Sequence, residues 1–119
     1  MKMTLVIGAS EKPQRYSNIA IHRLRNYGHE VNAIGLRAGK VADVTIDTGK
    51  PVFNGIDTVT LYINPSRQEE FFDYIVSLKP KRVIFNPGTE NPDFENRLAI
   101  TGIRVEEACT LVLLSIGQY

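Results

Sequence analysis

The segment TLVIGASEKPQRYSNIAIHRL, residues 4–24, contains an apolar run, a glycine, a polar loop and an amphipathic stretch, in that order. The run Thr4 to Ile7 is rich in β-branched residues and shows no polar alternation, which is typical of a strand buried on both faces of a parallel sheet. Gly8 ends this strand. We expect Ser17 to cap a helix whose apolar side chains recur at helical spacing from Ala20 onward. The segment therefore predicts a strand, a turn and a helix.

The rest of the chain repeats this alternation of strand and helix. Further strands are expected at Val31–Gly35, Thr58–Ile63, Val83–Phe85 and Ile103–Val105. Further helices are expected after Asn64-Pro65 up to Pro80, over Asp93–Thr101 and over Thr110–Ile116. The stretch from Leu36 to Gly55 is interrupted by glycine and proline, and its short run Val41–Ile46 stays open between strand and loop.

Strands that alternate with helices at this spacing predict right-handed crossovers and a parallel sheet. We predict an α/β fold, a three-layer Rossmann-like domain that spans residues 1–119 as a single unit. Its sheet is expected to have about five parallel strands in the order 3-2-1-4-5, where strand 3 is Thr58–Ile63. The point at which the strand order reverses is expected beside the first strand.

Composition excludes several classes of function. The 119 residues are 43% hydrophobic and 23% charged, with a net charge of +1, so the basic excess typical of nucleic-acid binding is absent. The single cysteine, Cys109, cannot form an intramolecular disulfide and is typical of a reducing compartment. The apolar run Leu111–Leu114 is too short to cross a bilayer, and no signal peptide is evident. We therefore expect a cytoplasmic protein without a membrane or nucleic-acid partner.

Four loops are expected to meet at the carboxyl ends of the strands, where open α/β sheets bind ligands. They are Gly8–Tyr16, Gly35–Lys40, Ile63–Ser66 and Asn86–Gly88. The first loop offers a glycine for close backbone approach, the hydroxyl of Ser10, the cations Lys12 and Arg15, and the amides at the start of a helix. A helix N-terminus beside cations is a natural phosphate site.

The second strand ends in a basic stretch. Dinucleotide dehydrogenases carry an acidic residue here to accept the ribose hydroxyls, along with a G-x-G-x-x-G fingerprint. This chain instead has Arg37 and Lys40, and lacks the second and third glycines. Two cations at this position favour a ligand with a phosphate on its ribose, such as CoA or NADP. The alternative, that both side chains are simply solvated, stays open.

The sequence also resembles a known family, the small stand-alone CoA-binding domains related to the N-terminal domain of succinyl-CoA ligase α subunits and of ADP-forming acyl-CoA synthetases. The resemblance is carried by VIGAS (residues 6–10), P-x-R-Y-S (13–17), YGHEV (27–31), IDTV (56–59), NPG (86–88) and GIRVExAC (102–109). It implies that the adenosine-phosphate end of CoA is bound by residues of the first loop, Gly8, Ala9, Ser10, Arg15 and Ser17. It also points to the segments after the second and third strands.

Two positions depart from the family pattern. The family usually has an Asn-Pro turn after the second strand, where this chain has Gly35-Leu36. It tends to have a basic residue directly after the third strand, where this chain has Ile63-Asn64-Pro65 and a shifted Arg67.

No catalytic constellation or metal site is evident. His22 and His29 are expected on or just after the first helix, facing solvent, and the metal ligands a site would need are not clustered. Asp47-Thr48-Gly49 matches the aspartic-protease triplet, but that chemistry needs an all-β dimer, so we read it as a turn. Cys109 is expected to be a small buried side chain.

We therefore predict non-catalytic binding of coenzyme A, as a module or regulator in acyl-CoA metabolism. Arg15 is expected to neutralise the pyrophosphate, with Arg37 and Lys40 as further counter-charges, and Ile34 and Ile63 are expected to flank the adenine. One alternative is an NADP-type nucleotide binder with a redox or regulatory role. Another is an interaction subunit whose ligand site has decayed. Partners in these cases would be a ligase subunit or a second copy of the chain.

Overall fold

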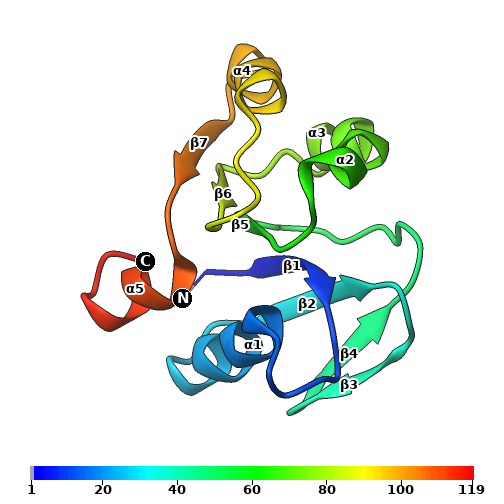
Figure 1. Cartoon of the computed structure of the whole chain (residues 1–119), viewed down its shortest axis with the longest axis vertical. Helices are drawn as coiled ribbons and strands as arrows, with labels where there is room; N and C mark the ends of the chain where they lie inside the picture. The colour runs from blue at the N-terminus through cyan, green and yellow to red at the C-terminus, as the bar shows by residue number, and fades with distance from the viewer. Residues whose placement is uncertain (1) are drawn as a thin grey trace.

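The alternation of strands and helices is confirmed in the computed structural model, which describes residues 2–119 (Figure 1). The strands are β1 (Thr4–Ala9), β2 (Val31–Gly35), β3 (Gly39–Val41), β4 (Val44–Asp47), β5 (Thr58–Leu61), β6 (Arg82–Phe85) and β7 (Arg104–Glu107). The helices are α1 (Tyr16–Asn26), α2 (Pro65–Gln68), α3 (Phe72–Leu78), α4 (Pro92–Ile100) and α5 (Thr110–Ser115), with a 3-10 turn η1 (Glu69–Phe71) between α2 and α3.

All the strands of the described chain lie in one sheet, in the order β3-β4-β2-β1-β5-β6-β7. Every neighbouring pair is parallel except β3 and β4, which form an antiparallel hairpin. The Rossmann-like α/β class is confirmed, but the predicted count of five strands and the order 3-2-1-4-5 are wrong. The hairpin, unassigned in the sequence, pairs with β2 and occupies that edge, so Thr58–Leu61 pairs with β1 on its other side.

The strand order reverses at β1, as predicted. The chain runs from β1 outward through β2 to the hairpin, and then crosses back to place β5 against the opposite edge of β1. Crevices at the carboxyl ends of strands open at such a reversal. The loop that follows β1 therefore lies between the loops that follow β2 and β5.

The two faces of the sheet are covered by different helices (Figure 1): α1 and α5 on one side, and α2, α3 and α4 on the other. Alternate residues of β1 point to opposite faces, as the pleat requires. Leu5 and Ile7 belong to the apolar cluster under α3 and α4, whereas Val6 packs under α1 and α5. All three are fully buried. Burial of side chains of this size contributes roughly 1.5–3 kcal/mol each, so β1 is anchored from both sides.

Helix α1 begins one residue earlier than its expected cap. The N-cap residue is Arg15, in an extended conformation, and Ser17 lies buried inside the first turn instead of capping it. The preceding loop causes this shift, because the Arg15 N–H donates to the Lys12 carbonyl and closes a turn just before the helix. The helix ends as predicted, with Gly28 at a positive φ of 85°.

Candidate functional site

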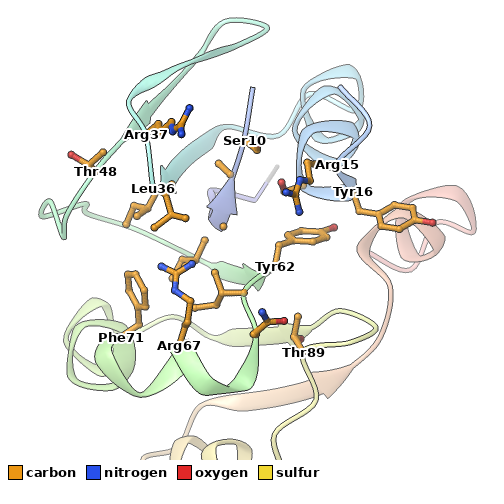
Figure 2. Close-up of a pocket in the computed structure, with 18 of the residues that line it drawn as sticks. Ser10, Arg15, Tyr16, Leu36, Arg37, Thr48, Tyr62, Arg67, Phe71 and Thr89 are labelled. Carbon is orange, nitrogen blue, oxygen red and sulfur yellow. The ribbon is translucent and has the colours of Figure 1, made fainter. Parts of the chain in front are cut away.

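A cavity of about 820 Å³ opens at the carboxyl ends of β1, β2, β5 and β6 (Figure 2). Its walls are the four loops that the sequence predicts to converge there, together with residues 48–50 after β4 and the start of α2. This volume falls in the range of ordinary small-molecule sites. The cavity is therefore the candidate functional site.

Two glycines allow the backbones of neighbouring strands to approach one another at the cavity floor. Gly8 sits in a bulge of β1 with a φ of 100°, and a Cβ placed there would lie 2.7 Å from the Tyr62 carbonyl oxygen. A Cβ on Gly35 would collide with the Ala9 carbonyl oxygen. Both positions require glycine because a side chain would push the loop after β1 away from its neighbours.

The loop after β1 is held in shape by its own hydrogen bonds. The Lys12 N–H donates to the Ser10 hydroxyl (3.1 Å), and the Asn18 side-chain amide donates to the Ser10 carbonyl (2.9 Å). No side chain of the described residues caps α1, and its first turn holds no acidic residue. The positive end of the α1 dipole is therefore open to an anion in the cavity.

The opposite wall is braced by two buried amides. Gln68 is fully buried and donates to the carbonyls of Ile63 (3.2 Å) and Thr89 (2.7 Å), while its oxygen accepts from the side chain of Asn91. It thereby ties the loop after β5 to the loop after β6. Asn86 similarly joins the ends of the central strands to α5, because it donates to the Leu61 carbonyl and accepts from the Thr110 N–H.

Tyr62 forms part of the wall nearest α5. Its hydroxyl is buried and has no hydrogen-bond partner. Within residues 2–119, it is the buried side-chain polar atom for which this is so. Burial raises the pKa of Tyr62 far above its ordinary value, although the nearby hydroxyls of Thr110 and Thr60 act in the opposite direction. Tyr62 is therefore neutral at any physiological pH.

One side of the cavity is apolar. Ile34, Ile63 and Phe71 are almost fully buried where they face it, whereas Leu36 is 77% exposed at its edge. Figure 2 shows Leu36 and Phe71 on the same side of the cavity. An exposed leucine beside buried apolar residues at a cavity rim offers a surface for a flat, apolar ligand group.

The charges around the cavity are unbalanced, although the whole chain is almost neutral. Five cationic side chains line it, against two acidic ones. The cations are Lys12, Arg15, Arg37, Lys50 and Arg67, and the acids are Glu11 and Glu70. The Glu11 carboxylate accepts from the Lys40 N–H (3.0 Å), which links the loop after β1 to the hairpin. The remaining excess of positive charge favours an anionic ligand.

Of the nine predicted site residues, eight line the cavity: Gly8, Ala9, Ser10, Arg15, Ser17, Ile34, Arg37 and Ile63. Lys40 is the exception. It lies in β3, and its side chain is not among the lining groups, because the hairpin carries it away along the sheet edge. Sequence reasoning treated Gly35–Lys40 as a loop at the strand end, and had no signal for the hairpin.

Sequence reasoning missed several lining residues. Lys50 follows the unassigned β4, and Phe71 lies in η1, beyond α2. The sequence marks Arg67 only as a cation displaced from the family position. The DTG triplet, predicted as a turn, instead begins with the last residue of β4, Asp47, and only Gly49, with a φ of 77°, lies in a bend. Thr48 between them is part of the cavity wall. Proximity of residues 48–50 to β1 could not be inferred without the pairing of β4 with β2.

The remaining reactive side chains lie outside the cavity. His22 is exposed on α1, and His29, expected to face solvent, is instead half-buried, accepting from the Lys2 N–H (3.0 Å). Cys109 is a free, half-buried residue at the start of α5. Within residues 2–119, no three His, Cys, Asp or Glu side chains gather as a metal site. No helix in this part of the chain is long and apolar enough to cross a membrane.

Comparison with solved structures places the chain among small proteins of the same fold. A crystal structure of an uncharacterised protein is 50% identical over 100% of this chain and 98% of its own, with a TM-score of 0.97. A Thermus thermophilus protein is 21% identical over 99% of this chain and 90% of its own, with a TM-score of 0.87.

One larger neighbour has a named activity. An acetyl-coenzyme A synthetase of Candidatus Korarchaeum cryptofilum, solved with phosphate and ADP, is 18% identical over 90% of this chain, with a TM-score of 0.74. This chain spans 25% of that synthetase, and at this identity the likeness shows the fold alone.

Curated protein sequences give no match to the chain. A family profile described as a CoA binding domain matches residues 2–115, nearly the whole chain. The fold is Rossmann-like, and its cation-lined cavity lies at the carboxyl ends of the strands. Because the profile matches nearly the whole of it, the chain belongs to the CoA binding domain family.

Proposed function

We propose that the cavity binds coenzyme A by its adenosine-phosphate end, and that the protein holds this ligand without transforming it. The pyrophosphate lies against the Ser10 loop and the open N-terminus of α1, with Arg15 as its counter-charge. The adenine lies on the apolar side, between Ile34 and Ile63. The ribose phosphate lies toward Arg37.

The observation that carries this proposal is the position of the cavity. A cation-lined pocket opens at the reversal of strand order, directly before the uncapped α1, in a chain of the CoA binding domain family. The family supports the class of ligand, and the position of the cations and of the α1 N-terminus supports the proposed orientation.

Binding without catalysis is supported by the lining itself. Among the described residues, neither histidine lines the cavity, and Cys109 is not part of its wall. The imidazole and thiol groups that often serve as base and nucleophile in covalent catalysis are therefore not part of this described lining. The protein would act as a binding module or regulator in acyl-CoA metabolism, and ligation of an acyl group would need a separate partner subunit.

Titration by calorimetry tests this function. The protein is titrated with CoA, dephospho-CoA, NADP and NAD, alongside Arg15→Ala and the control Arg23→Ala, whose side chain is exposed on α1 outside the cavity. We expect CoA to bind, and Arg15→Ala to weaken it by about 10- to 100-fold, because a charge-assisted hydrogen bond contributes roughly 1.5–3 kcal/mol. Arg23→Ala should leave the affinity unchanged.

The other outcomes separate the alternatives. Binding of NADP without CoA would replace the proposal with an NADP-dependent role, since Arg37 suits either ribose phosphate. If none of the four ligands binds in the titration, the proposal that the cavity binds a nucleotide is wrong.

A further inference from the structure

Tyr62 is a polar residue of the cavity wall to which the proposed function gives no role. It follows β5 directly and lines the cavity. Its hydroxyl is buried and, within residues 2–119, has no hydrogen-bond partner. Buried polar atoms are nearly always paired in native proteins, so an exception at a ligand cavity calls for a physical explanation.

The hydroxyls beside Tyr62 are already engaged with other groups. Those of Thr60 and Thr110 bond each other at 2.8 Å, and Thr60 also accepts from the Asn86 side-chain amide at 2.6 Å. Both threonines are fully buried. They lie near enough to Tyr62 to affect its pKa, but neither bonds to it. The surrounding protein therefore leaves the Tyr62 hydroxyl available for a partner from outside the fold.

We propose that Tyr62 is a switch residue whose hydrogen bonding is completed by the ligand. On binding, its ring turns toward the cavity, and its hydroxyl bonds a neutral polar group of the ligand beyond the pyrophosphate. The inference rests on the proposed function, since it assumes a nucleotide whose pyrophosphate lies at Arg15. It adds the residue that distinguishes a nucleotide with a polar arm on its pyrophosphate from one without.

The place of Tyr62 in the cavity indicates which part of the ligand it meets. Figure 2 shows Tyr62 on the side of Arg15 and Thr89, whereas Leu36 and Phe71 lie on the other side. All five residues line the cavity. With the adenosine on the apolar side and the pyrophosphate at Arg15, the remainder of the ligand would pass Tyr62.

The chemistry of the hydroxyl favours a neutral partner. Burial raises the pKa of Tyr62, so the group keeps its proton and can both donate and accept a hydrogen bond. An amide or hydroxyl of the ligand offers the matching donor and acceptor. The Tyr62 side chain is only partly buried, so rotation between staggered conformations can carry its hydroxyl to the cavity while β5 stays in place.

The unpaired hydroxyl gives Tyr62 a test with two opposite signs. In the free protein the hydroxyl lowers stability, because burial removes its bonds to water and nothing replaces them. Tyr62→Phe should therefore raise the melting temperature of the free protein by roughly 3–6 °C. The same substitution should weaken CoA binding by about tenfold, because phenylalanine cannot supply the hydrogen bond. A tyrosine with a merely structural role would lose stability and affinity together.

The experiment combines thermal melting of the free protein with calorimetric titration of CoA, dephospho-CoA and ADP. Dephospho-CoA and ADP differ only in the arm attached to the pyrophosphate, so they isolate the proposed contact. We expect Tyr62→Phe to weaken CoA and dephospho-CoA by the same factor, about tenfold, and to leave ADP within about twofold of the wild type.

Two other tyrosines provide matched controls. The Tyr74 hydroxyl donates to the Pro51 carbonyl at 2.6 Å, outside the cavity, so Tyr74→Phe should lower the melting temperature. Tyr27 is exposed and also lies outside the cavity, so Tyr27→Phe should change neither the melting temperature nor the affinities.

The outcomes separate this inference from the proposed function. Opposite signs in melting temperature and CoA affinity support the switch, and the ADP comparison assigns the contact to the arm. A lower melting temperature for Tyr62→Phe would overturn the switch, because its hydroxyl would then be bonded in the free protein. An unchanged CoA affinity, or an equal loss for CoA and ADP, would also overturn it while CoA binding stands. A wild-type protein that binds none of the three ligands would remove the proposed function, and the switch with it.

Discussion

At Gly8 the backbone of β1 passes so close to β5 that an alanine side chain would meet the Tyr62 carbonyl at 2.7 Å. Gly8→Ala should therefore lower the free energy of unfolding by about 2–3 kcal/mol, from the collision together with the strain of a positive φ. Urea denaturation measures this loss. Gly102→Ala is the matched control, because Gly102 has a similar φ of 93° but no atom within 4 Å of an added Cβ. It should cost only about 1 kcal/mol. If the two variants lose the same free energy of unfolding, the close approach of Gly8 to the Tyr62 carbonyl does not contribute to the cost of Gly8→Ala.

At the scale of elements, Gln68 is the link between α2, the loop after β6 and the start of α4. Gln68→Leu keeps the volume but leaves the carbonyls of Ile63 and Thr89 without their donor. We expect a loss of about 2–4 kcal/mol in urea denaturation, since a buried polar group without its partner costs about 1–3 kcal/mol. Gln118→Leu, at an exposed position, should stay within about 0.5 kcal/mol of the wild type. An unchanged midpoint for Gln68→Leu would show that these loops hold together without it.

Comparison of the elements shows that the sequence predicts helix positions well and strand pairing poorly. Periodicity and turn residues identified α1, α4 and α5 to within a residue or two, because these signals are local. The partner of each strand is decided by tertiary contacts, and the short hairpin of β3 and β4 left no periodic trace between its glycines. Because the sequence does not predict this hairpin, it predicts the wrong neighbour for Thr58–Leu61 in the sheet. It also predicts, wrongly, that Lys40 lines the cavity. The first loop was predictable because a glycine, cations and a helix start coincide in one short stretch.

At the scale of the whole molecule, residues from both ends of the sequence meet beside the first residue of β1, at the amino ends of the strands. His29, after α1, packs edge-on against Tyr119 at 5.0 Å and accepts from the Lys2 N–H. Burial lowers the pKa of His29, and the Lys2 charge adds to the effect. A histidine with a lowered pKa in the folded state contributes full stability above its unfolded pKa of about 6.5, and this stability is lost as the pH falls below that value.

The wild-type protein should therefore unfold at lower urea at pH 5.5 than at pH 7.5. His29→Gln should lose this part of the pH dependence, because glutamine can accept from Lys2 but carries no titrating group. His22→Gln, at an exposed site on α1, should behave like the wild type. A pH dependence in His29→Gln equal to that of the wild type would assign the effect to other groups.

The hairpin of β3 and β4 has a consequence for exchange of the ligand. It joins the sheet through β4, at the pairs Ala33–Ile46 and Ile34–Asp47, whereas β1 is paired along its length on both sides. Segments with few contacts open locally at a small fraction of the global unfolding free energy. No residue of the hairpin lines the cavity itself, but Thr48, Gly49 and Lys50, which follow β4, do. We therefore expect this side of the cavity to open more readily than the side built on the central strands. A ligand held in the cavity would then leave on the time scale on which residues 48–50 move, while the centre of the sheet stays closed.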